Sequence, residues 1–575
     1  MSQIDQVHEL TPAEIAAVVE DPMVLELRDD VDELVPTLPV QPFLRVVQAL
    51  QKEGRLDLVL PHATAEQLTG VLDLSAWRED RVRIPEARGW LLAIVDHIGD
   101  DRPRGTLVET IYEMDPEMWG LALAPMTAVA EIDVEDDMST QRILDHMGAL
   151  RTWETPDGYF VVGVPDDAFG RAAIKILKAV YADSLEEGRK LANAVKWGLH
   201  TEVEEDLLRW RSGRLADLGF PTREDAMRLF VPVGLKEIEP DEDDSVPPPP
   251  AVPGALPVSW RDGGDLLRRV MSQLEAGIHG DRSREFLLLV NELMVAQGME
   301  PGDVEGQQRA VHQAQATLSL GLELLVAGED DEQSVDRLVR VVERAGVRQL
   351  FRFAYGPLSK LRKAVLALHR EGRISIDKLA SLLDRPWGPV LRALSPWYPE
   401  LPLSNSEEKR RPIRNRSDLA RATARVGEAA ALARLCFDPN GYAVDPVWVT
   451  RVDRPEKLRL GDLIRTALIS ERLPGRRGGE GFAPLGAEDL GWARRELLDA
   501  AGALKPEVES DFRARVAAIG AEVHADVLAE ALLTRLATEL AGLELDAEDK
   551  VHLPSAGGAL TVQDVGVWLQ MRTGV

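Results

Sequence analysis

The sequence contains very little cysteine. Cys436 is the only one in 575 residues, which excludes an intrachain disulfide and any zinc site built from cysteines. A lone thiol is typical of a protein from a reducing compartment. A nucleophilic cysteine needs a neighbouring base, and Leu435 and Phe437 supply none, so we interpret Cys436 as a buried structural residue.

Long apolar runs are also missing. The first residues are polar and acidic, unlike the basic and then apolar start of a secretory signal. The most apolar window, residues 118–130, contains Pro125 and is well short of the ~20 residues of a membrane helix. We therefore expect a cytoplasmic protein without a membrane segment.

Local catalytic motifs are absent from the sequence. It has no Gly-x-x-x-x-Gly-Lys-[Ser/Thr] loop, no Gly-x-Gly-x-x-Gly after a strand, no His-Glu-x-x-His and no Gly-x-Ser-x-Gly. The ten histidines are scattered, so no helical metal-binding pair exists. We expect no metal site and no cofactor, although side chains from distant positions can still converge in space.

Acidic residues outnumber basic ones, 97 to 67, for a formal net charge of −30. The excess is uneven, because residues 1–244 contain 50 acidic and 24 basic residues, whereas residues 245–575 contain 47 and 43. An acidic surface repels nucleic acid and anionic membranes, so we do not expect either as a partner. The charge either promotes solubility or allows the N-terminal part to dock a basic protein.

Helix start signals recur in the N-terminal part. Thr11-Pro12-Ala13-Glu14 and Thr64-Ala65-Glu66-Gln67 are capping boxes, and Pro85 and Pro116 are placed to open two further helices. Starts about 25 residues apart are typical of stacked helical hairpins in a solenoid-like array. Apolar spacing predicts later helices over residues 284–297, 304–326, 335–345, 350–369, 419–435 and 507–540.

Strand signals are few. Residues 152–162 place Pro156-Asp157-Gly158 between two β-rich segments and predict a hairpin, and residues 551–562 are a second candidate. We therefore predict an all-α, multi-domain protein with one or two small β-hairpins.

Two proline-rich segments interrupt the helical pattern. Residues 239–259 are acidic and then proline-rich, and residues 399–416 combine prolines with basic residues. Neither composition suits a helix or a central strand, so both segments are interpreted as linkers. The predicted domains are therefore 1–238, 260–398 and 417–575.

Residues 209–221 combine three arginines, an aspartate and two aromatic residues. Such side chains could line an anion pocket, which would suit an enzyme of unfamiliar type. The candidate residues of this segment are Arg211, Arg214, Asp217, Gly219 and Phe220.

The same segment also fits a purely structural corner, which we favour. Gly219 would take the left-handed position after a helix, and Phe220 would fold back onto Leu215. Asp217 is one helical turn from Arg214 and could form an ion pair with it.

A further segment, residues 365–395, has the spacing of a helix-turn-helix. Pro386 and Pro389 would interrupt the start of its second helix, where base contacts are made, so DNA binding is only an alternative. A basic cluster follows and could contact phosphate, the acidic half of the same chain or an external partner. Its members are Lys409, Arg410, Arg411, Arg414 and Arg416.

Three segments resemble an uncharacterised bacterial domain family of unknown function. They are residues 68–81, with the core Val-Leu-Asp-Leu-Ser-Ala-Trp-Arg-Glu-Asp-Arg, residues 211–221, with Arg-Ser-Gly-Arg-Leu-Ala-Asp-Leu-Gly-Phe-Pro, and, more loosely, residues 411–419. The resemblance extends to about residue 420 and implies a helical protein. It implies no activity, cofactor or catalytic residue.

These observations favour a non-catalytic helical scaffold or interaction protein with a protein partner. An enzyme with a pocket near Arg211, Arg214 and Asp217, and a DNA-binding protein that uses residues 365–395, are the alternatives. The sequence contains no signal for the pathway or the oligomeric state.

Overall fold

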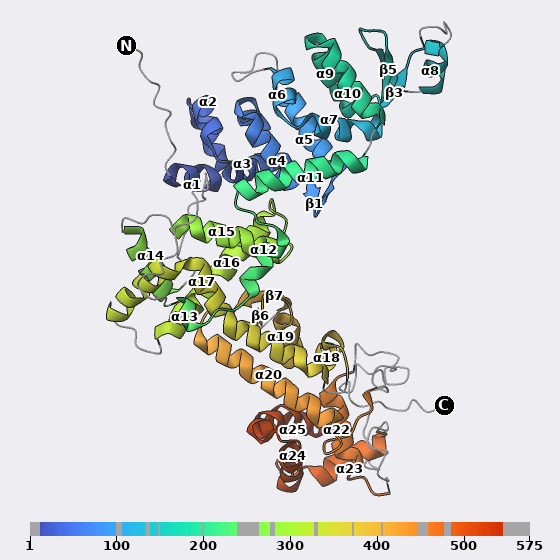
Figure 1. Cartoon of the computed structure of the whole chain (residues 1–575). Coiled ribbons are helices and arrows are strands. Elements are labelled where there is room, and N and C mark those ends of the chain that lie inside the picture. Colours follow the sequence, from blue (N-terminus) through green and yellow to red (C-terminus); the bar gives the residue numbers. More distant parts are fainter. Residues whose placement is uncertain are drawn as a thin grey trace. The chain divides into compact units, whose positions relative to one another are not determined.

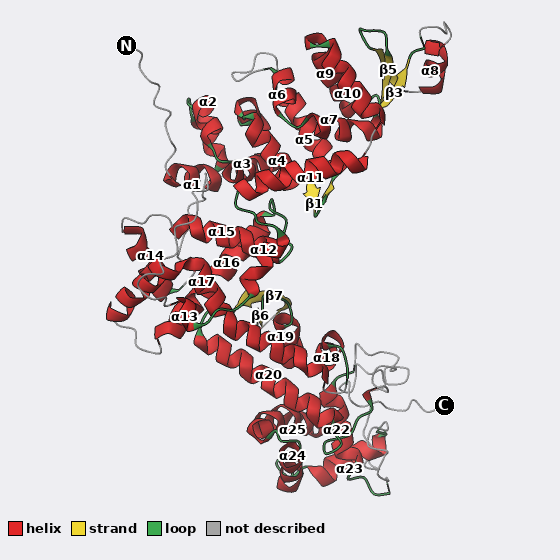
Figure 2. Cartoon of the chain, viewed as in Figure 1, coloured by secondary structure: helices red, strands yellow, loops and turns green. Residues whose placement is uncertain are grey.

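The fold comes from a computed structural model of the chain. The structure describes residues 12–98, 106–133, 139–147, 150–197, 200–238, 264–276, 282–326, 332–370, 373–403, 406–446, 458–475 and 485–543. Helices dominate these residues, and the strands are short and antiparallel (Figure 1, Figure 2). The predicted class, all-α with small β additions, is confirmed.

Contacts divide the chain into two compact units. Unit 1 comprises residues 1–231, 235–315 and 329–352. Unit 2 comprises residues 232–234, 316–328 and 353–575. The three predicted domains stay predictions.

Several helices of unit 1 begin where the sequence places caps or prolines. Thr64 and Gln67 form both hydrogen bonds of the predicted capping box, and prolines open two of the later helices. The helices are α1 (Pro12–Glu20), α2 (Val31–Leu34), α3 (Val40–Glu53), α4 (Ala65–Ser75), α5 (Ile84–His97), α6 (Leu107–Glu113), α7 (Pro116–Leu123), α8 (Ser139–Met147), α9 (Ala168–Asp183), α10 (Leu185–Trp197), α11 (His200–Asp217), α12 (Arg223–Met227), α13 (Leu235–Ile238), α14 (Asp265–Ala276) and α15 (Arg282–Ala296). Two more, α16 (Val304–Val326) and α17 (Glu332–Ala367), continue from unit 1 into unit 2.

The predicted hairpin at 152–162 is present and belongs to a three-stranded sheet. Strands β4 (Arg151–Glu154) and β5 (Phe160–Val164) pair antiparallel, and β3 (Ala128–Glu131) covers the other edge of β5. All of β5 is buried, and α9 and α10 pack near it. A separate two-stranded pair, β1 (Trp77–Arg78) and β2 (Arg81–Val82), follows α4. The second predicted hairpin, at 551–562, and the linker at 239–259 lie outside the described residues.

Unit 2 places a β-hairpin among its helices. Its elements after α17 are α18 (Ile376–Leu382), α19 (Trp387–Leu394), β6 (Glu400–Leu403), β7 (Ser406–Pro412), α20 (Arg416–Phe437), α22 (Leu460–Ser470), α23 (Ala487–Leu497), α24 (Pro506–Ala518) and α25 (Ala525–Ala541). Helix α19 packs against α18, β6 and α20, and α25 packs against α22 and α24. The hairpin occupies most of the predicted linker at 399–416. Cys436 is buried, as predicted, and burial raises the pKa of its thiol.

Candidate functional site

The corner at residues 215–220 has the geometry predicted for a helix end. Gly219 has φ +82°, and its amide donates to the carbonyl of Ala216 at 2.9 Å. The Phe220 amide reaches back to the Leu215 carbonyl at 2.8 Å, and both of these side chains are buried. This pattern of hydrogen bonds is a Schellman cap at the end of α11.

The two candidate arginines beside this corner bind parts of unit 1 that are distant in sequence. Arg214 donates to Asp73, with Nε to Oδ2 at 2.5 Å and Nη2 to Oδ1 at 3.0 Å, and to Asp115 Oδ2 at 2.7 Å. Arg211 donates from Nε to the Asp73 carbonyl at 2.8 Å and stacks over the ring of Trp77 at 4.9 Å. The two arginines therefore connect α11 to α4, β1 and the residue before α7.

The predicted ion pair between Arg214 and Asp217 is not formed; Asp217 is exposed, and Arg214 is occupied by Asp73 and Asp115. Asp73 is buried, with 1% of its surface exposed. Burial raises the pKa of the Asp73 carboxyl, and the hydrogen bond and charge of Arg214 oppose that rise. Arg214 therefore compensates a carboxylate that would be unstable alone in this position.

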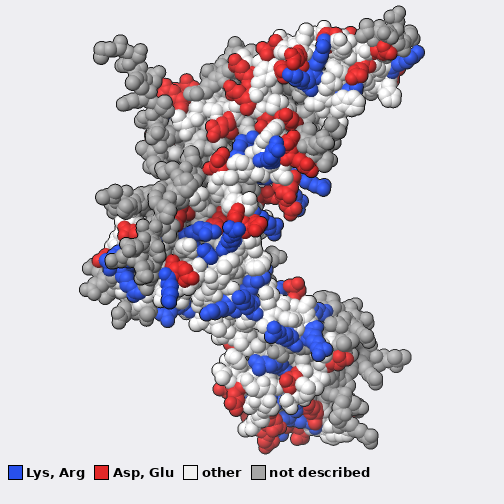
Figure 3. Space-filling model, viewed as in Figure 1, with Lys and Arg blue, Asp and Glu red and all other residues white. Residues whose placement is uncertain are grey.

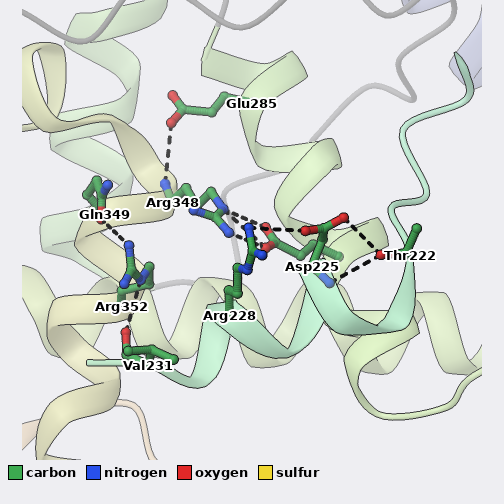
Figure 4. A network of polar contacts seen from close by, with 9 residues as sticks. Thr222, Asp225, Arg228, Val231, Glu285, Arg348, Gln349 and Arg352 are labelled. Carbon is green, nitrogen blue, oxygen red and sulfur yellow. Dashed lines mark hydrogen bonds and ion pairs between the residues drawn. The ribbon is translucent and has the colours of Figure 1, made fainter. Parts of the chain in front are cut away.

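Residues of the corner also line a groove of about 710 Å³, and Figure 4 labels four of its charged residues, Asp225, Arg228, Arg348 and Arg352. Ala216, Gly219, Pro221 and Leu288 contribute the apolar lining. Its charged lining residues are Asp225, Arg228, Glu292, Arg348 and Arg352.

Each guanidinium of this groove already has a partner within unit 1. Arg348 donates from Nε to Glu292 Oε2 at 2.8 Å, and Arg228 pairs with Asp225 at 3.2 Å. Arg352 donates to the Val231 carbonyl at 2.9 Å, as the dashed line in Figure 4 shows. The positive charges of the three arginines are nearly balanced by the negative charges of the two carboxylates, so the groove attracts an anionic ligand only weakly.

A second pocket, in unit 2, has a larger excess of positive charge. We call it the arginine pocket; its volume is about 340 Å³. Four arginines line it: Arg385 before α19, Arg411 on β7, and Arg421 and Arg425 one turn apart on α20. The rest of its wall is apolar and consists of Pro386, Pro389, Val390, Leu401, Pro402 and Leu403.

Two nearly buried carboxylates orient three of these guanidiniums. Asp418 accepts two hydrogen bonds from Arg411, at 2.6 and 2.7 Å, and one from Arg421 at 2.9 Å. Glu428 accepts from Arg425 at 2.7 Å, and Trp387 Nε1 donates to the same oxygen at 2.7 Å. The hydrogen bonds and charge of Arg411 lower the pKa of Asp418, which keeps this carboxyl ionised.

Both carboxylate side chains are only 8% exposed, so they lie behind the arginines rather than in the opening. An arginine has five N–H donors, and one carboxylate uses at most two of them. Guanidiniums held in this way remain able to bind a second anion, and their fixed position reduces the entropy lost on binding.

Only one residue of the predicted basic cluster lines the arginine pocket. That residue is Arg411, whereas Lys409, Arg410, Arg414 and Arg416 are exposed and outside its lining. The prediction missed Arg385, Arg421 and Arg425. A signal for the last two existed, because they are four residues apart in a predicted helix and therefore share a face. On the face shown in Figure 3, blue side chains gather over α18, α19 and α20.

The predicted helix-turn-helix corresponds to α18 and α19, and Ser375 caps the first of these helices. Six of the eight residues of α19 are buried, including Trp387, Val390 and Leu391. Arg392 is its one exposed residue. A recognition helix reads base edges with polar side chains, and DNA binding through residues 365–395 stays a prediction.

Neither a metal site nor a membrane helix is found in the part of the chain that the structure describes. No three His, Cys, Asp or Glu side chains converge there in a way that could hold a metal ion. No described helix combines the length and apolarity that are needed to cross a bilayer.

Residues 20–555 match the model of a family of unknown function, DUF6178. The chain belongs to this family. The DUF6178 match includes the three segments that carry the resemblance, and it extends beyond residue 420 to residue 555. Membership of DUF6178 assigns no activity. No curated protein and no solved structure matches the chain.

Proposed function

We propose that the protein is a non-catalytic helical interaction protein that binds an acidic partner protein at the arginine pocket of unit 2. The observation that carries this proposal is the convergence of Arg385, Arg411, Arg421 and Arg425 around one apolar pocket. Asp418 and Glu428 pair with Arg411, Arg421 and Arg425 and lie behind them, so further N–H donors of these three guanidiniums can bind an acidic group in the opening.

The size and lining of the pocket favour a protein segment as its ligand. A volume of about 340 Å³ is at the small end for ligand pockets, and it suits one or two side chains. Proline, leucine and valine walls offer apolar contact beside the guanidiniums. An acidic side chain next to an apolar one in the partner would satisfy both features.

The lining also supports a binding role rather than catalysis. It consists of arginine, proline, leucine and valine, none of which acts as a nucleophile or as a general base near neutral pH. Arginine stays protonated at any physiological pH and therefore provides charge and direction only.

Affinity purification from the native host, after nuclease treatment, tests the proposal with two matched variants. Arg421→Gln/Arg425→Gln removes two charges from the pocket. Arg410→Gln/Arg414→Gln removes two charges from exposed residues of the same unit that do not line it. Circular dichroism checks that both variants fold.

We expect wild type and the Arg410/Arg414 variant to retain the same stoichiometric partner. The pocket variant should lose it, because each charge-assisted contact contributes roughly tenfold in affinity. Retention of the partner by the pocket variant, or equal loss in both variants, would contradict the proposal. A wild-type preparation without any partner would also contradict it.

A further inference from the structure

Unit 1 contains a cluster of positive charge that the proposed function does not use. Arg171, Lys175 and Lys178 follow one another along one face of α9, and Arg151 on β4 faces the same groove. We call this the α9 groove; its volume is about 660 Å³. The remaining lining residues are Thr106, Leu107, Val108, Ile174, Ala179, Ala182 and Asp183.

The carboxylates of the described residues do not neutralise this cluster. Asp183, which lines the groove, accepts a hydrogen bond from the Tyr112 hydroxyl at 2.9 Å. Within the described ranges, no carboxylate pairs with Arg151, Arg171 or Lys178.

The two lysines of the groove make different contacts. Lys175 Nζ donates to the Val95 carbonyl at 2.7 Å, which fixes the position of its charge. Lys178 Nζ lies 5.8 Å from the centre of the Trp153 ring. Neither contact removes a positive charge, so the groove keeps four cations against one carboxylate.

This grouping is unusual for its surroundings. Residues 1–244 contain 50 acidic and 24 basic residues. Several basic side chains elsewhere in unit 1 have carboxylate partners, as Arg189 does with Asp157 at 2.6 Å and Arg214 with Asp73. Like charges one turn apart on a helix destabilise it, so a bound anion would stabilise this arrangement.

We propose that the α9 groove binds a small ligand that carries two or more linked phosphate groups. A helix rises 1.5 Å per residue, so Arg171 and Lys178 are placed roughly 10 Å apart along α9. A single phosphate cannot reach all of these charges, whereas a short chain of phosphates can. Arginine binds phosphate through paired N–H donors and lysine as a point charge, and the groove contains both.

The charge of the surrounding unit favours a compact ligand over a nucleic acid. A long polyanion would extend beyond the groove onto a surface with a large acidic excess, and repulsion there would offset its contacts. A compact ligand is confined to the four cations and avoids this repulsion.

Isothermal titration calorimetry of the full chain with inorganic tripolyphosphate tests the inference. Arg171→Gln/Lys178→Gln removes two charges from the groove. Lys190→Gln/Arg209→Gln removes one lysine and one arginine from exposed positions of the same unit, on α10 and α11. We expect wild type and the control variant to bind with equal Kd, and the groove variant to bind at least about tenfold more weakly.

Three further titrations identify the ligand class. Inorganic orthophosphate should bind more weakly than tripolyphosphate, and adenosine triphosphate should bind comparably to it. Tripolyphosphate should bind the Arg421→Gln/Arg425→Gln variant as it binds wild type, which separates this site from the arginine pocket.

Four results would overturn the inference. These are no binding of tripolyphosphate to wild type, equal loss in the groove and control variants, loss in the Arg421/Arg425 variant, and tighter binding of a single-stranded oligonucleotide that the groove variant abolishes. Thermal unfolding of each variant confirms that a loss of binding is not a loss of fold.

Discussion

Arg214 shows how a single side chain can hold three segments of unit 1 together. It donates to Asp73 on α4 and to Asp115 before α7, and it comes from α11. Asp73 has little contact with water, so its charge depends on Arg214 for compensation. Removing one partner from such a pair leaves a buried charge alone, which is more damaging than the pair is stabilising.

We therefore expect Arg214→Gln to destabilise unit 1 by about 3 kcal/mol. Thermal unfolding followed by circular dichroism should show a melting temperature lower by roughly 6–12 °C. Asp217→Asn is the matched control, because Asp217 is on the same helix but exposed, and it should change stability by less than about 0.5 kcal/mol. A similar loss in both variants would show that α11 itself, and not the Arg214 contacts, sets the effect.

The sequence predicted the hydrogen bonds within this corner, but it did not predict the contacts of Arg214 with residues distant in the chain. The hydrogen bonds of Gly219 and Phe220 join residues at most five apart, so the order of residue types was sufficient to place them. The partners of Arg214 are 141 and 99 residues away. Asp217 was the nearest carboxylate in sequence, but packing of α11 against α4 and α7 brought others closer.

At the scale of elements, the end of α11 depends on a glycine for two separate reasons. The left-handed backbone of Gly219 is strained for other residues, and a Cβ there would lie 2.4 Å from Leu288 Cδ2 on α15. Gly54 ends α3 with a similar φ of +69°, but a Cβ there would meet no atom within 4 Å. A substitution at either position would therefore strain the backbone, but only at Gly219 would the new Cβ also lie too close to another side chain.

We expect Gly54→Ala to destabilise the protein by about 1 kcal/mol, from left-handed strain alone. Gly219→Ala should destabilise it by about 2 kcal/mol, because Leu288 must also move. Chemical denaturation of the two variants measures the difference. Equal losses would mean that Leu288 yields freely and that the corner does not fix the position of α15.

The predicted helix boundaries were confirmed where the apolar spacing and the glycines indicated the same end of a helix. Residues 304–326 were predicted as one helix, and α16 has these bounds. The predicted gap between 345 and 350 contains Gly346, whose φ of +76° interrupts α17.

The single helix predicted over residues 507–540 was wrong. It breaks between α24 and α25, where Gly520 has φ +67° and the Ala521 amide caps the Val516 carbonyl. Gly520 was a visible signal for this break.

The hairpin β6–β7 was missed for a physical reason. Pro402 and Pro412 lie in its strands, and proline is usual only at strand edges or ends. A two-stranded hairpin has two edges and tolerates them, and β6 gains further support because it packs on α19. That support is tertiary, so composition alone indicated a linker, and the arginine pocket beside the hairpin could not be placed.

At the scale of the whole molecule, two effects give stability the same dependence on pH. The net charge of −30 causes self-repulsion that weakens as carboxylates and histidines take up protons. In unit 2, burial raises the pKa of the Asp462 carboxyl to about 7, opposed mainly by the charge of Arg465. Its pKa in the unfolded chain is about 3.9. Between these values the folded state binds more protons, so stability decreases as pH rises from about 4 to 7.

Salt separates the two effects, because it screens exposed charges and leaves a buried group almost unchanged. Asp462 is 1% exposed. Lowering the pH from 8 to 6 should therefore stabilise the wild type at both low and high salt, with a smaller gain at high salt. We expect about 1 kcal/mol of this gain to persist in 0.5 M NaCl, from protonation of Asp462.

Thermal unfolding at the two pH values and two salt concentrations measures these gains. Asp462→Asn should lose the gain that persists at high salt, because asparagine does not titrate. Asp526→Asn, a change at a side chain that is 92% exposed in the same unit, should keep it. If Asp462→Asn retains the full gain in 0.5 M NaCl, the carboxyl is ionised at pH 6 through its contact with Arg465, and the pH dependence of the molecule comes from its surface charge.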